Sequence, residues 1–267
     1  MVSLLYHLIR LSEDLKAIIK QTDMNTSQTL DQLRELKLNG MHEHYQEVLR
    51  MPSHDQPDSH ELIAMLTQSE LLYKTNRKTQ KYVKDARFRY QATLEGIDYH
   101  PERNLNKNQL LTLASCSFIK RGENVIITGA TGCGKSYIAT ALGYRACSLG
   151  YKTLYLNMSR LDEQLLMCEA DATRSKFLSR LSRAELLIMD DFGLSPMTQR
   201  LRMALLQIME DRYDRKAVII TSQLPFTTWY DYLNEPTLAD EIMDRLSVTA
   251  NRLDLEGESL RKKFNKK

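Results

Sequence analysis

The stretch that most constrains this chain runs from Val125 to Ser136 and reads VIITGATGCGKS. An apolar run typical of a buried strand stops at a glycine-rich turn, and a helical pattern follows from Tyr137 to Leu149. This is the phosphate-binding pattern G-x-x-x-x-G-K-[ST] in its strand–turn–helix context. The alternative, a glycine-rich turn that fits the pattern by chance, leaves the flanking strand and helix unexplained.

The loop predicts how a polyphosphate is bound. Its glycines lack Cβ atoms, so backbone N–H groups can approach the anion, and the following helix presents its positive dipole end. Lys135 is placed to reach the β- and γ-phosphates, and the Ser136 hydroxyl to ligate Mg²⁺. The expected nucleotide contacts are Gly129, Ala130, Thr131, Gly132, Cys133, Gly134, Lys135 and Ser136.

A second apolar run, LLIMDDFG, begins at Leu186 and ends in two acids. A strand that runs into an acid is the Walker B arrangement, in which Asp190 holds Mg²⁺ through water close to Ser136. Asp191 then stands where a carboxylate can orient and deprotonate an attacking water. The alternative is a pair of acids that cap a strand, but the phosphate loop about fifty residues upstream favours the metal site.

Two further side chains are candidates for the same site. A polar cluster ends the apolar run 217–221, and Gln223 within it could detect the γ-phosphate or position water, because ligands bind at the carboxyl ends of parallel strands. A turn-forming role is the alternative. Arg245 comes late in an amphipathic segment, where a cation could act as an arginine finger in a neighbouring subunit. Its spacing alone favours a salt bridge to Glu241 or Asp244.

Strand and helix patterns alternate after Asn124. We expect strands at 125–128, 152–157, 186–190, 217–221 and 248–255, with helices at 135–149, from 159, and at 173–184, 199–213, 228–233 and 237–246. The strands are apolar throughout, as in a parallel sheet covered on both faces. The predicted fold class is therefore α/β, a five-stranded parallel sheet flanked by helices.

The first hundred residues differ in character. Helical patterns occupy 1–23, 30–48 and 60–75, and a loop is expected at 51–59. We divide the chain into an N-terminal extension (1–23), a helical domain (24–92) with a basic segment at 74–89, and a nucleotide-binding domain (93–267) with a basic tail.

The basic segment carries seven cations against one acid in sixteen residues, with Tyr82 and Phe88 interleaved and Tyr90 directly after it. Such a run is typical of a surface that contacts phosphate backbones, although most basic runs are solvated helix faces. A second basic segment follows at 173–184. The candidate DNA contacts are Lys74, Arg77, Lys78, Lys81, Lys84, Arg174, Lys176 and Arg180.

Composition excludes several classes of protein. The four cysteines include no C-x-x-C pair, so a disulfide framework or zinc site is not expected, and a reducing cytoplasm is the default location. No apolar run approaches the roughly 20 residues of a membrane span, and the acids at 13 and 14 do not suit a secretory signal. The net charge of +3 decides nothing about partners by itself.

Several motifs in order make the sequence recognisable. FIKRGENV from Phe118 leads into GATGCGKS, and LLIMDDFG, ITSQLPFTTW, IMDRL and GESLR follow. Near the N-terminus, TLDQLRELKLNGM from Thr29 and TLEGIDY from Thr93 also match. Together they resemble the IstB-like AAA+ ATPases, helper proteins of insertion-sequence transposition, which are related to the DnaC-type helicase loaders.

The resemblance implies an ATP- and Mg²⁺-dependent ATPase that binds double-stranded DNA, forms a ring or helical homo-oligomer, and recruits or activates a DDE transposase. Lys135 and Ser136 then bind nucleotide and metal, Asp190 is the Walker B acid and Gln223 is sensor 1. Arg245 resembles the arginine finger that acts in trans, and Arg261 is a candidate for a second nucleotide-contacting arginine.

The sequence departs from the family pattern in places. Residues 1–23 lie outside the match, so Met24 could be the start. Asp191 replaces the usual glutamate and is one methylene shorter, which predicts slow hydrolysis. Sensor 1 is Gln where relatives often have Asn, and the chain leaves no room for a helical lid. A DnaC-like helicase loader is the alternative function, whereas a GTPase is disfavoured because no Asn-Lys-x-Asp signature follows the loop.

Overall fold

The structure is a computed structural model that describes residues 25–248 and 250–260. It divides into two compact units, Met1–Lys78 and Thr79–Lys267, and the division falls inside a long helix, α3 (Ser59–Ala86). The expected extension at 1–23 and the candidate Arg261 lie outside the described residues. The expected domain boundary after residue 92 stays a prediction.

The first unit is helical. Residues 25–35 form a helix, α2 spans Asn39–Arg50, and the first part of α3 completes the unit. The buried carboxylate of Glu70 on α3 accepts hydrogen bonds from the backbone N–H groups of Gly40 (2.7 Å) and Met41 (3.2 Å). An acid at these unsatisfied N–H groups stabilises the start of α2 and fixes α2 against α3.

Helix α3 is longer than the pattern at 60–75 predicts. Asp58 begins it as a cap, because its Oδ1 accepts from the N–H groups of His60 (2.9 Å) and Glu61 (2.8 Å). No glycine or proline interrupts the sequence until the helix ends before Arg87, which has φ 57°. The basic segment therefore lies on one continuous helix up to Ala86, because nothing in its sequence breaks the helix where the charge begins.

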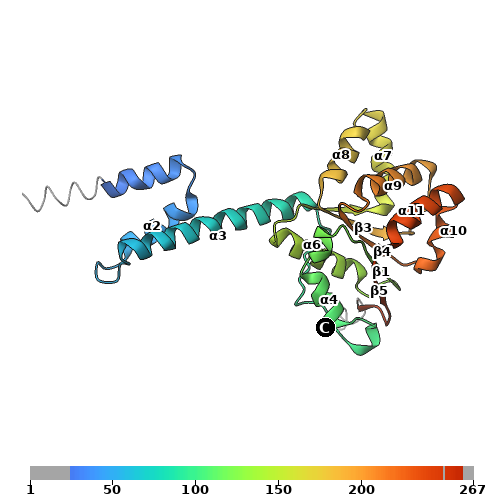
Figure 1. The fold of residues 1–267 in the computed structure, drawn as a ribbon, viewed down its shortest axis with the longest axis horizontal. Helices are drawn as coiled ribbons and strands as arrows, with labels where there is room; N and C mark the ends of the chain where they lie inside the picture. The colour runs from blue at the N-terminus through green and yellow to red at the C-terminus, as the bar shows by residue number, and fades with distance from the viewer. Residues whose placement is uncertain (1–24, 249, 261–267) are drawn as a thin grey trace, which may run out of the picture. The chain divides into compact units, whose positions relative to one another are not determined.

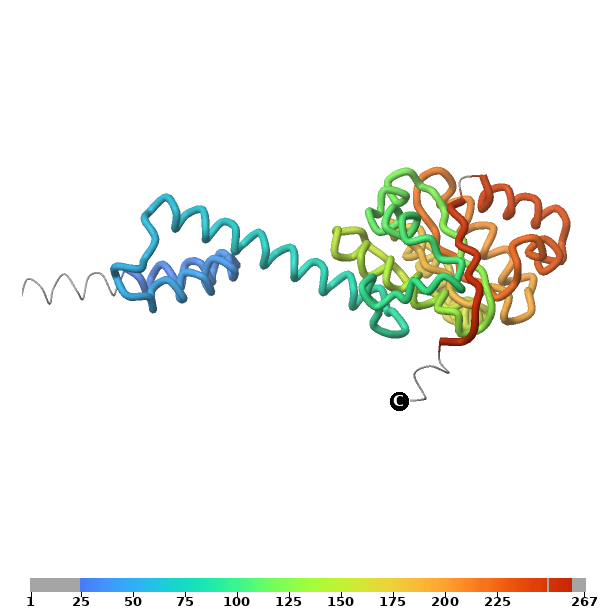
Figure 2. The backbone as a smooth tube through the Cα atoms, turned by 90° about the horizontal axis from the view of Figure 1, so that it is seen from below, coloured from blue at the N-terminus to red at the C-terminus, as the bar shows by residue number. Residues whose placement is uncertain are grey.

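The second unit contains a five-stranded sheet. Its strands are β1 (Val125–Gly129), β2 (Thr153–Asn157), β3 (Leu186–Phe192), β4 (Ala217–Ser222) and β5 (Asn251–Leu255). They are all paired in parallel, in the order β2-β3-β4-β1-β5. Figure 2 shows β5, in red, running beside β1, with which it pairs from Val125–Asn251 to Gly129–Leu255. The predicted α/β fold with a five-stranded parallel sheet flanked by helices is confirmed.

Helices cover both faces of this sheet (Figure 1). The helices are α4 (Lys107–Ala114), α5 (Ser117–Lys120), α6 (Lys135–Ser148), α7 (Leu161–Ala170), α8 (Arg174–Arg183), α9 (Gln199–Arg212), α10 (Trp229–Leu233) and α11 (Pro236–Ser247), with short 3₁₀ turns at Pro101–Arg103, Met158–Arg160 and Phe226–Thr228.

Successive strand residues face opposite layers, as the two-residue repeat of a strand requires. Ile126 and Ile220 belong to the core shared with α7 to α11, whereas Ile127 and Ile219 belong to the core shared with α4, α5 and α6. Two separate apolar cores therefore hold the sheet rigid from both sides, and its strand ends are free to carry polar groups.

Two strand boundaries differ from the expected ones in a way that matters. The third strand does not end at Asp190 but continues to Phe192, with a register shift between Met189 and Phe192, because Phe192 is buried against Trp229 at a ring distance of 4.5 Å. The fifth strand begins at Asn251 rather than at residue 248, because α11 continues to Ser247. The other strand boundaries differ by at most one residue, but the helical pattern expected at 30–48 is split into two helices at residues 36–38, where Lys37 has φ 59°.

Candidate functional site

The phosphate loop joins β1 to α6 with two glycines that no other residue could replace without strain. Gly132 has φ +84°, and a Cβ there would lie 2.1 Å from Ser259 Oγ. Gly134 has φ +92° and forms the N-cap of α6, and a Cβ there would lie 2.8 Å from a guanidinium nitrogen of Arg103. Both positions require the left-handed region that glycine adopts without cost. The glycine pattern of the sequence thus corresponds to a tight turn at the start of α6.

Lys135, the first residue of α6, is buried and folds back over the loop. Its Nζ donates to the carbonyl oxygens of Gly129 and Ala130, each at 2.8 Å. These bonds hold the ammonium at the concave side of the turn, where it lines a cavity of about 530 Å³. An ammonium in this position supplies the point charge that a phosphate group requires.

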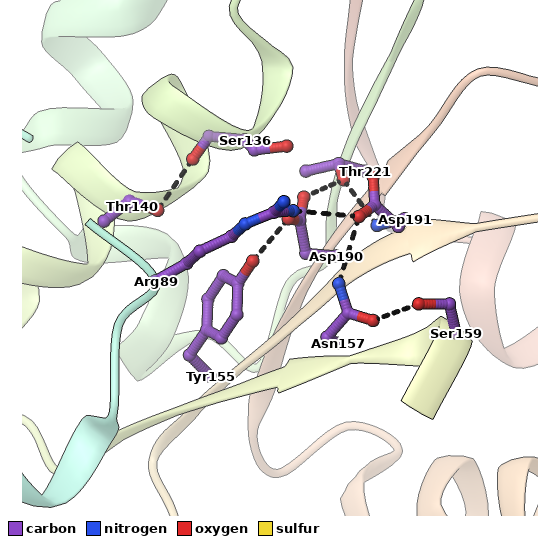
Figure 3. A network of polar contacts seen from close by, with 9 residues as sticks. All are labelled: Arg89, Ser136, Thr140, Tyr155, Asn157, Ser159, Asp190, Asp191 and Thr221. Carbon is purple, nitrogen blue, oxygen red and sulfur yellow. Dashed lines mark hydrogen bonds and ion pairs between the residues drawn. The ribbon is translucent and has the colours of Figure 1, made fainter. Parts of the chain in front are cut away.

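Asp190 is fully buried and its two carboxylate oxygens are separately satisfied (Figure 3). Thr221 Oγ1 on β4 donates to Oδ1, and the Tyr155 hydroxyl on β2 donates to Oδ2. Burial, followed by the bond to Asp190, raises the pKa of Tyr155, so this hydroxyl stays a donor. The two bonds stabilise a carboxylate in the middle of the sheet, which would otherwise be costly to bury.

Asp191 adopts a left-handed backbone conformation with φ 63°. Its N–H donates to Thr221 Oγ1 (3.1 Å), and its Oδ2 accepts from Asn157 Nδ2 at 3.0 Å and lies 3.4 Å from Arg89 Nη1 (Figure 3). This turn directs the second acid into the cavity while the first stays in the sheet. The paired acids of the sequence therefore have different environments.

Gln223 follows the end of β4 and reaches the phosphate loop. Its Oε1 accepts a hydrogen bond of 2.7 Å from Thr131 Oγ1, and both residues line the same cavity as Lys135 and Asp191. The structure thus brings the expected residues Lys135, Ser136, Asp191 and Gln223 to one cavity.

Arg103 is a site residue that the sequence did not reveal. Its guanidinium is buried, with Nη2 donating to the carbonyl oxygen of Cys133 inside the phosphate loop (2.6 Å) and Nη1 donating to the carbonyl oxygen of Asp98. The residue lies in a 3₁₀ turn that follows Pro101. The only signal for this turn in the sequence is Pro101, which is typical of the first position of a helical turn.

Arg89 and Tyr90 were likewise not expected in the cavity. A side-chain hydrogen bond joins Ser136 and Tyr90, and burial raises the pKa of Tyr90 by more than this bond lowers it. The Tyr90 ring stacks on Tyr137 at a centroid distance of 6.5 Å. Packing at this site thus explains Tyr90, the aromatic residue directly after the basic segment.

The segment after β5 lies against the phosphate loop. Leu260 N–H donates to the carbonyl oxygen of Gly132 (3.0 Å), and Leu260 also lines the cavity. The loop is therefore held by the chain on both sides, by Arg103 before it and by residues 259–260 after it.

The residues present fit a magnesium ion. Mg²⁺ prefers oxygen ligands, and the Ser136 hydroxyl and the Asp191 carboxylate both line the cavity. The buried carboxylate of Asp190 is a negative charge that a nearby cation would stabilise.

Arg245 does not line this cavity. Its guanidinium binds the side chain of Glu241 on the same helix and lies 3.7 Å from Glu210 on α9. The salt bridge to Glu241, which the spacing favoured, is present. A role for Arg245 in a neighbouring subunit stays a prediction.

The candidate DNA contacts lie on two helices. On α3, Lys74 forms an ion pair with Glu70 at 3.3 Å. On α8, Arg174 lies 3.8 Å from Glu169, and Arg180 Nη2 donates to the carbonyl oxygen of Asp85 (3.4 Å), close to the end of α3. The remaining candidates on these helices are Arg77, Lys78, Lys81, Lys84 and Lys176. Among residues 25–248 and 250–260, no helix is long and apolar enough to cross a membrane.

Comparison with solved structures supports the fold. A crystal structure of DnaI superposes with a TM-score of 0.54 and 17% sequence identity, covering 67% of this chain and 92% of that one. At this identity the likeness concerns the fold alone.

Sequence relatives are closer. An insertion sequence ATP-binding protein of Sinorhizobium fredii is 37% identical over 239 residues, which covers 90% of this chain and 98% of the relative. An ATP-binding protein of insertion sequence IS1162 from Pseudomonas fluorescens is 36% identical over 206 residues, or 77% of this chain and 89% of that protein. The family model described as IstB-like ATP binding protein matches residues 31–267. With the phosphate loop, Asp191 and Gln223 at one cavity, these matches show that the chain belongs to the IstB-like ATP-binding protein family.

Proposed function

We propose that this protein is a Mg²⁺-dependent ATPase that assembles on double-stranded DNA and recruits or activates a DDE transposase during insertion-sequence transposition. The observation that carries the nucleotide part is the meeting of Lys135, Ser136, Asp191 and Gln223 at one cavity. The transposition part is supported by the names of the relatives, which are ATP-binding proteins of insertion sequences.

Each side chain has a role in the proposed hydrolysis. Lys135 and the N–H groups at the start of α6 bind the β- and γ-phosphates. Ser136 and Asp190 would hold Mg²⁺, which when bound would neutralise charge on the phosphates. Asp191 accepts the proton of the attacking water, and Gln223, anchored by Thr131, orients that water against the terminal phosphate.

Asp191 is an aspartate with a short side chain, so its reach depends on its backbone. The left-handed turn at φ 63° and the bond from Asn157 direct its carboxylate into the cavity. We infer that this turn compensates in part for the missing methylene, and that hydrolysis is slow unless assembly or DNA improves the geometry.

Arg245 is proposed to complete the site of a neighbouring subunit in a ring or helical homo-oligomer. Arg245 does not line the nucleotide cavity of its own subunit. Its guanidinium is paired with Glu241 and Glu210, whose side chains are both about half-exposed. A cation so placed can exchange its partners for a phosphate when a second subunit docks.

DNA binding is proposed for the basic residues of α3 and α8. Phosphate contacts supply most of the affinity for DNA of any sequence, so these cations serve assembly on a target rather than recognition of a base sequence. The bond between Arg180 and the Asp85 carbonyl oxygen places α8 beside the end of α3.

The decisive experiment compares ATP binding and hydrolysis by the full chain and by Lys135→Ala, with and without double-stranded DNA and Mg²⁺. We expect ATP to promote assembly on DNA, DNA to stimulate hydrolysis, and Lys135→Ala to abolish nucleotide binding while the protein remains folded. Retained tight ATP binding by Lys135→Ala would contradict the site.

Co-purification distinguishes the two candidate partners. Capture of a transposase encoded beside this protein supports the proposed function. Capture of a replicative helicase instead would favour the helicase-loader alternative, which uses the same nucleotide chemistry.

A further inference from the structure

Arg89 lies in the short segment that follows α3, and its guanidinium enters the nucleotide cavity. Its Nη1 is 3.4 Å from Asp191 Oδ2, and Figure 3 shows the extended side chain pointing at that carboxylate. The Arg89 side chain is 55% exposed, so the pair is screened by water and contributes little net stability. It is a contact that another anion can replace at small cost.

Among the residues that the structure describes, two other cations line the cavity, and both differ from Arg89. Arg103 is buried and donates to backbone carbonyl oxygens of Asp98 and Cys133. Lys135 is buried and donates to those of Gly129 and Ala130. The Arg89 guanidinium, in contrast, is half-exposed and bonded to no backbone carbonyl oxygen that the described contacts include, so it can change its rotamer and stay hydrated.

We propose that Arg89 distinguishes a nucleoside triphosphate from a diphosphate, by exchanging the Asp191 carboxylate for the terminal phosphate. This inference rests on the proposed ATPase function and names a residue of that site which acts within its own subunit.

The exchange is favoured by charge and geometry. A terminal phosphate carries more negative charge than a carboxylate and accepts a guanidinium in a bidentate arrangement. Arg89 and Asp191 line the cavity together with Lys135 and Gln223, on which the terminal phosphate is expected. A diphosphate lacks this group and leaves the ion pair with Asp191 in place.

Release of Arg89 also prepares Asp191 for its proposed role. The carboxylate keeps the hydrogen bond from Asn157 and the backbone bond to Thr221, so its orientation persists without the guanidinium. The water that replaces Arg89 next to Oδ2 is then the one that Asp191 can deprotonate. One residue thereby links recognition of the triphosphate to exposure of the base.

The test measures dissociation constants for ADP and for a non-hydrolysable ATP analogue, by calorimetry on the full chain with Mg²⁺. In the Arg89→Ala variant we expect the preference for the triphosphate to fall about tenfold, while ADP affinity changes less than about twofold. Arg87→Ala is the matched control, because Arg87 belongs to the same segment and does not line the cavity. ADP binding by the variant shows that it is folded.

A double-mutant cycle separates exchange from simple repulsion between Asp191 and phosphate. Asp191→Asn should strengthen binding of the ATP analogue, and Arg89→Ala in the same chain should remove that gain if Arg89 is the group released. An equal gain in both backgrounds, or an unchanged preference in Arg89→Ala, would overturn the proposal. Absence of any nucleotide binding by the unaltered protein would instead refute the proposed function itself.

Discussion

The backbone N–H of Asp191 donates to Thr221 Oγ1 over 3.1 Å, and this bond joins the end of β3 to the end of β4. The same hydroxyl donates its proton to Asp190 Oδ1. The buried Thr221 side chain thus bonds to both acids of the Walker B pair. It donates to the carboxylate of Asp190 and accepts from the backbone N–H of Asp191. Thr221 therefore sets the left-handed turn at Asp191.

Replacement of Thr221 by valine tests this arrangement. Valine keeps the shape but leaves the buried Asp190 oxygen and the Asp191 N–H without their partner, at a cost of about 1–3 kcal/mol in unfolding free energy. We expect ATP turnover to fall more than about tenfold, because Asp191 loses its orientation. Thr221→Ser keeps the hydroxyl and should retain most of the stability and most of the ATP turnover. Denaturant unfolding measures the first and steady-state phosphate release the second. Equal behaviour of the valine and serine variants would show that the hydroxyl is dispensable.

A pair of glycine variants isolates the contact between Arg103 and the phosphate loop. Gly134 and Gly257 both have φ +92°, but a Cβ at Gly134 would lie 2.8 Å from Arg103 Nη2, whereas the nearest atom at Gly257 is 3.3 Å away. Each alanine pays the backbone strain of about 1–3 kcal/mol. Gly134→Ala should in addition displace Arg103 and weaken ATP binding, which calorimetry measures. If Gly257→Ala weakens ATP binding as much, the Arg103 contact has no special role.

Arg245 gives a prediction that separates stability from assembly. Its ion pairs with Glu241 and Glu210 are partly exposed, so Arg245→Ala should cost about 1 kcal/mol or less in the unfolding of the monomer. ATP turnover in the assembled state should fall much further, because the neighbouring site loses its cation. The control Glu241→Gln removes the same ion pair and should keep turnover. Unchanged turnover and assembly in Arg245→Ala would remove the trans role.

Charge reversal on α3 tests the basic segment. Changing Lys78, Lys81 and Lys84 to glutamate should weaken DNA binding at every sequence and reduce the slope of log K against log salt by about 3, if each contacts one phosphate. Fluorescence anisotropy at several salt concentrations measures both effects. Lys120→Glu on α5 is the control for a charge reversal outside the basic segment. The same affinity and slope as in the unaltered protein would mean that this segment is a solvated helix face.

Two buried thiols predict how stability depends on pH. Burial raises the pKa of Cys116 and of Cys147 from 9.0 to about 11. Both thiols stay protonated in the folded protein while those of the unfolded chain ionise, so their contribution to stability is complete below pH 9 and is lost as the pH rises to about 11. Urea unfolding should therefore show a decline in free energy across this interval. The decline should be smaller in a Cys116→Ala, Cys147→Ala double variant, and an identical decline would assign it to other groups.

The sequence was sufficient for much of the fold because its signals are local. Apolar strands that alternate with helices, and glycines at fixed offsets before Lys135 and Ser136, predict a parallel sheet with a phosphate loop at a strand end. The position of Gln223 at the loop could be predicted for the same reason, since the carboxyl ends of parallel strands meet at one edge.

Only the tertiary structure decided which side chains from distant segments enter that edge. Arg89 and Arg103 lie more than thirty residues before Lys135 in sequence, and neither belongs to the motifs that predicted the nucleotide site. Their side chains reach the cavity because the chain before β1 folds back over the start of α6. The spacing of apolar residues in the sequence does not predict the path of such a segment. Likewise, the pattern Asp-Asp could not predict which of the two acids faces the cavity. The bulge at the end of β3 did so, because burial of Phe192 draws the strand onward and turns Asp191 into the cavity while Asp190 stays in the sheet.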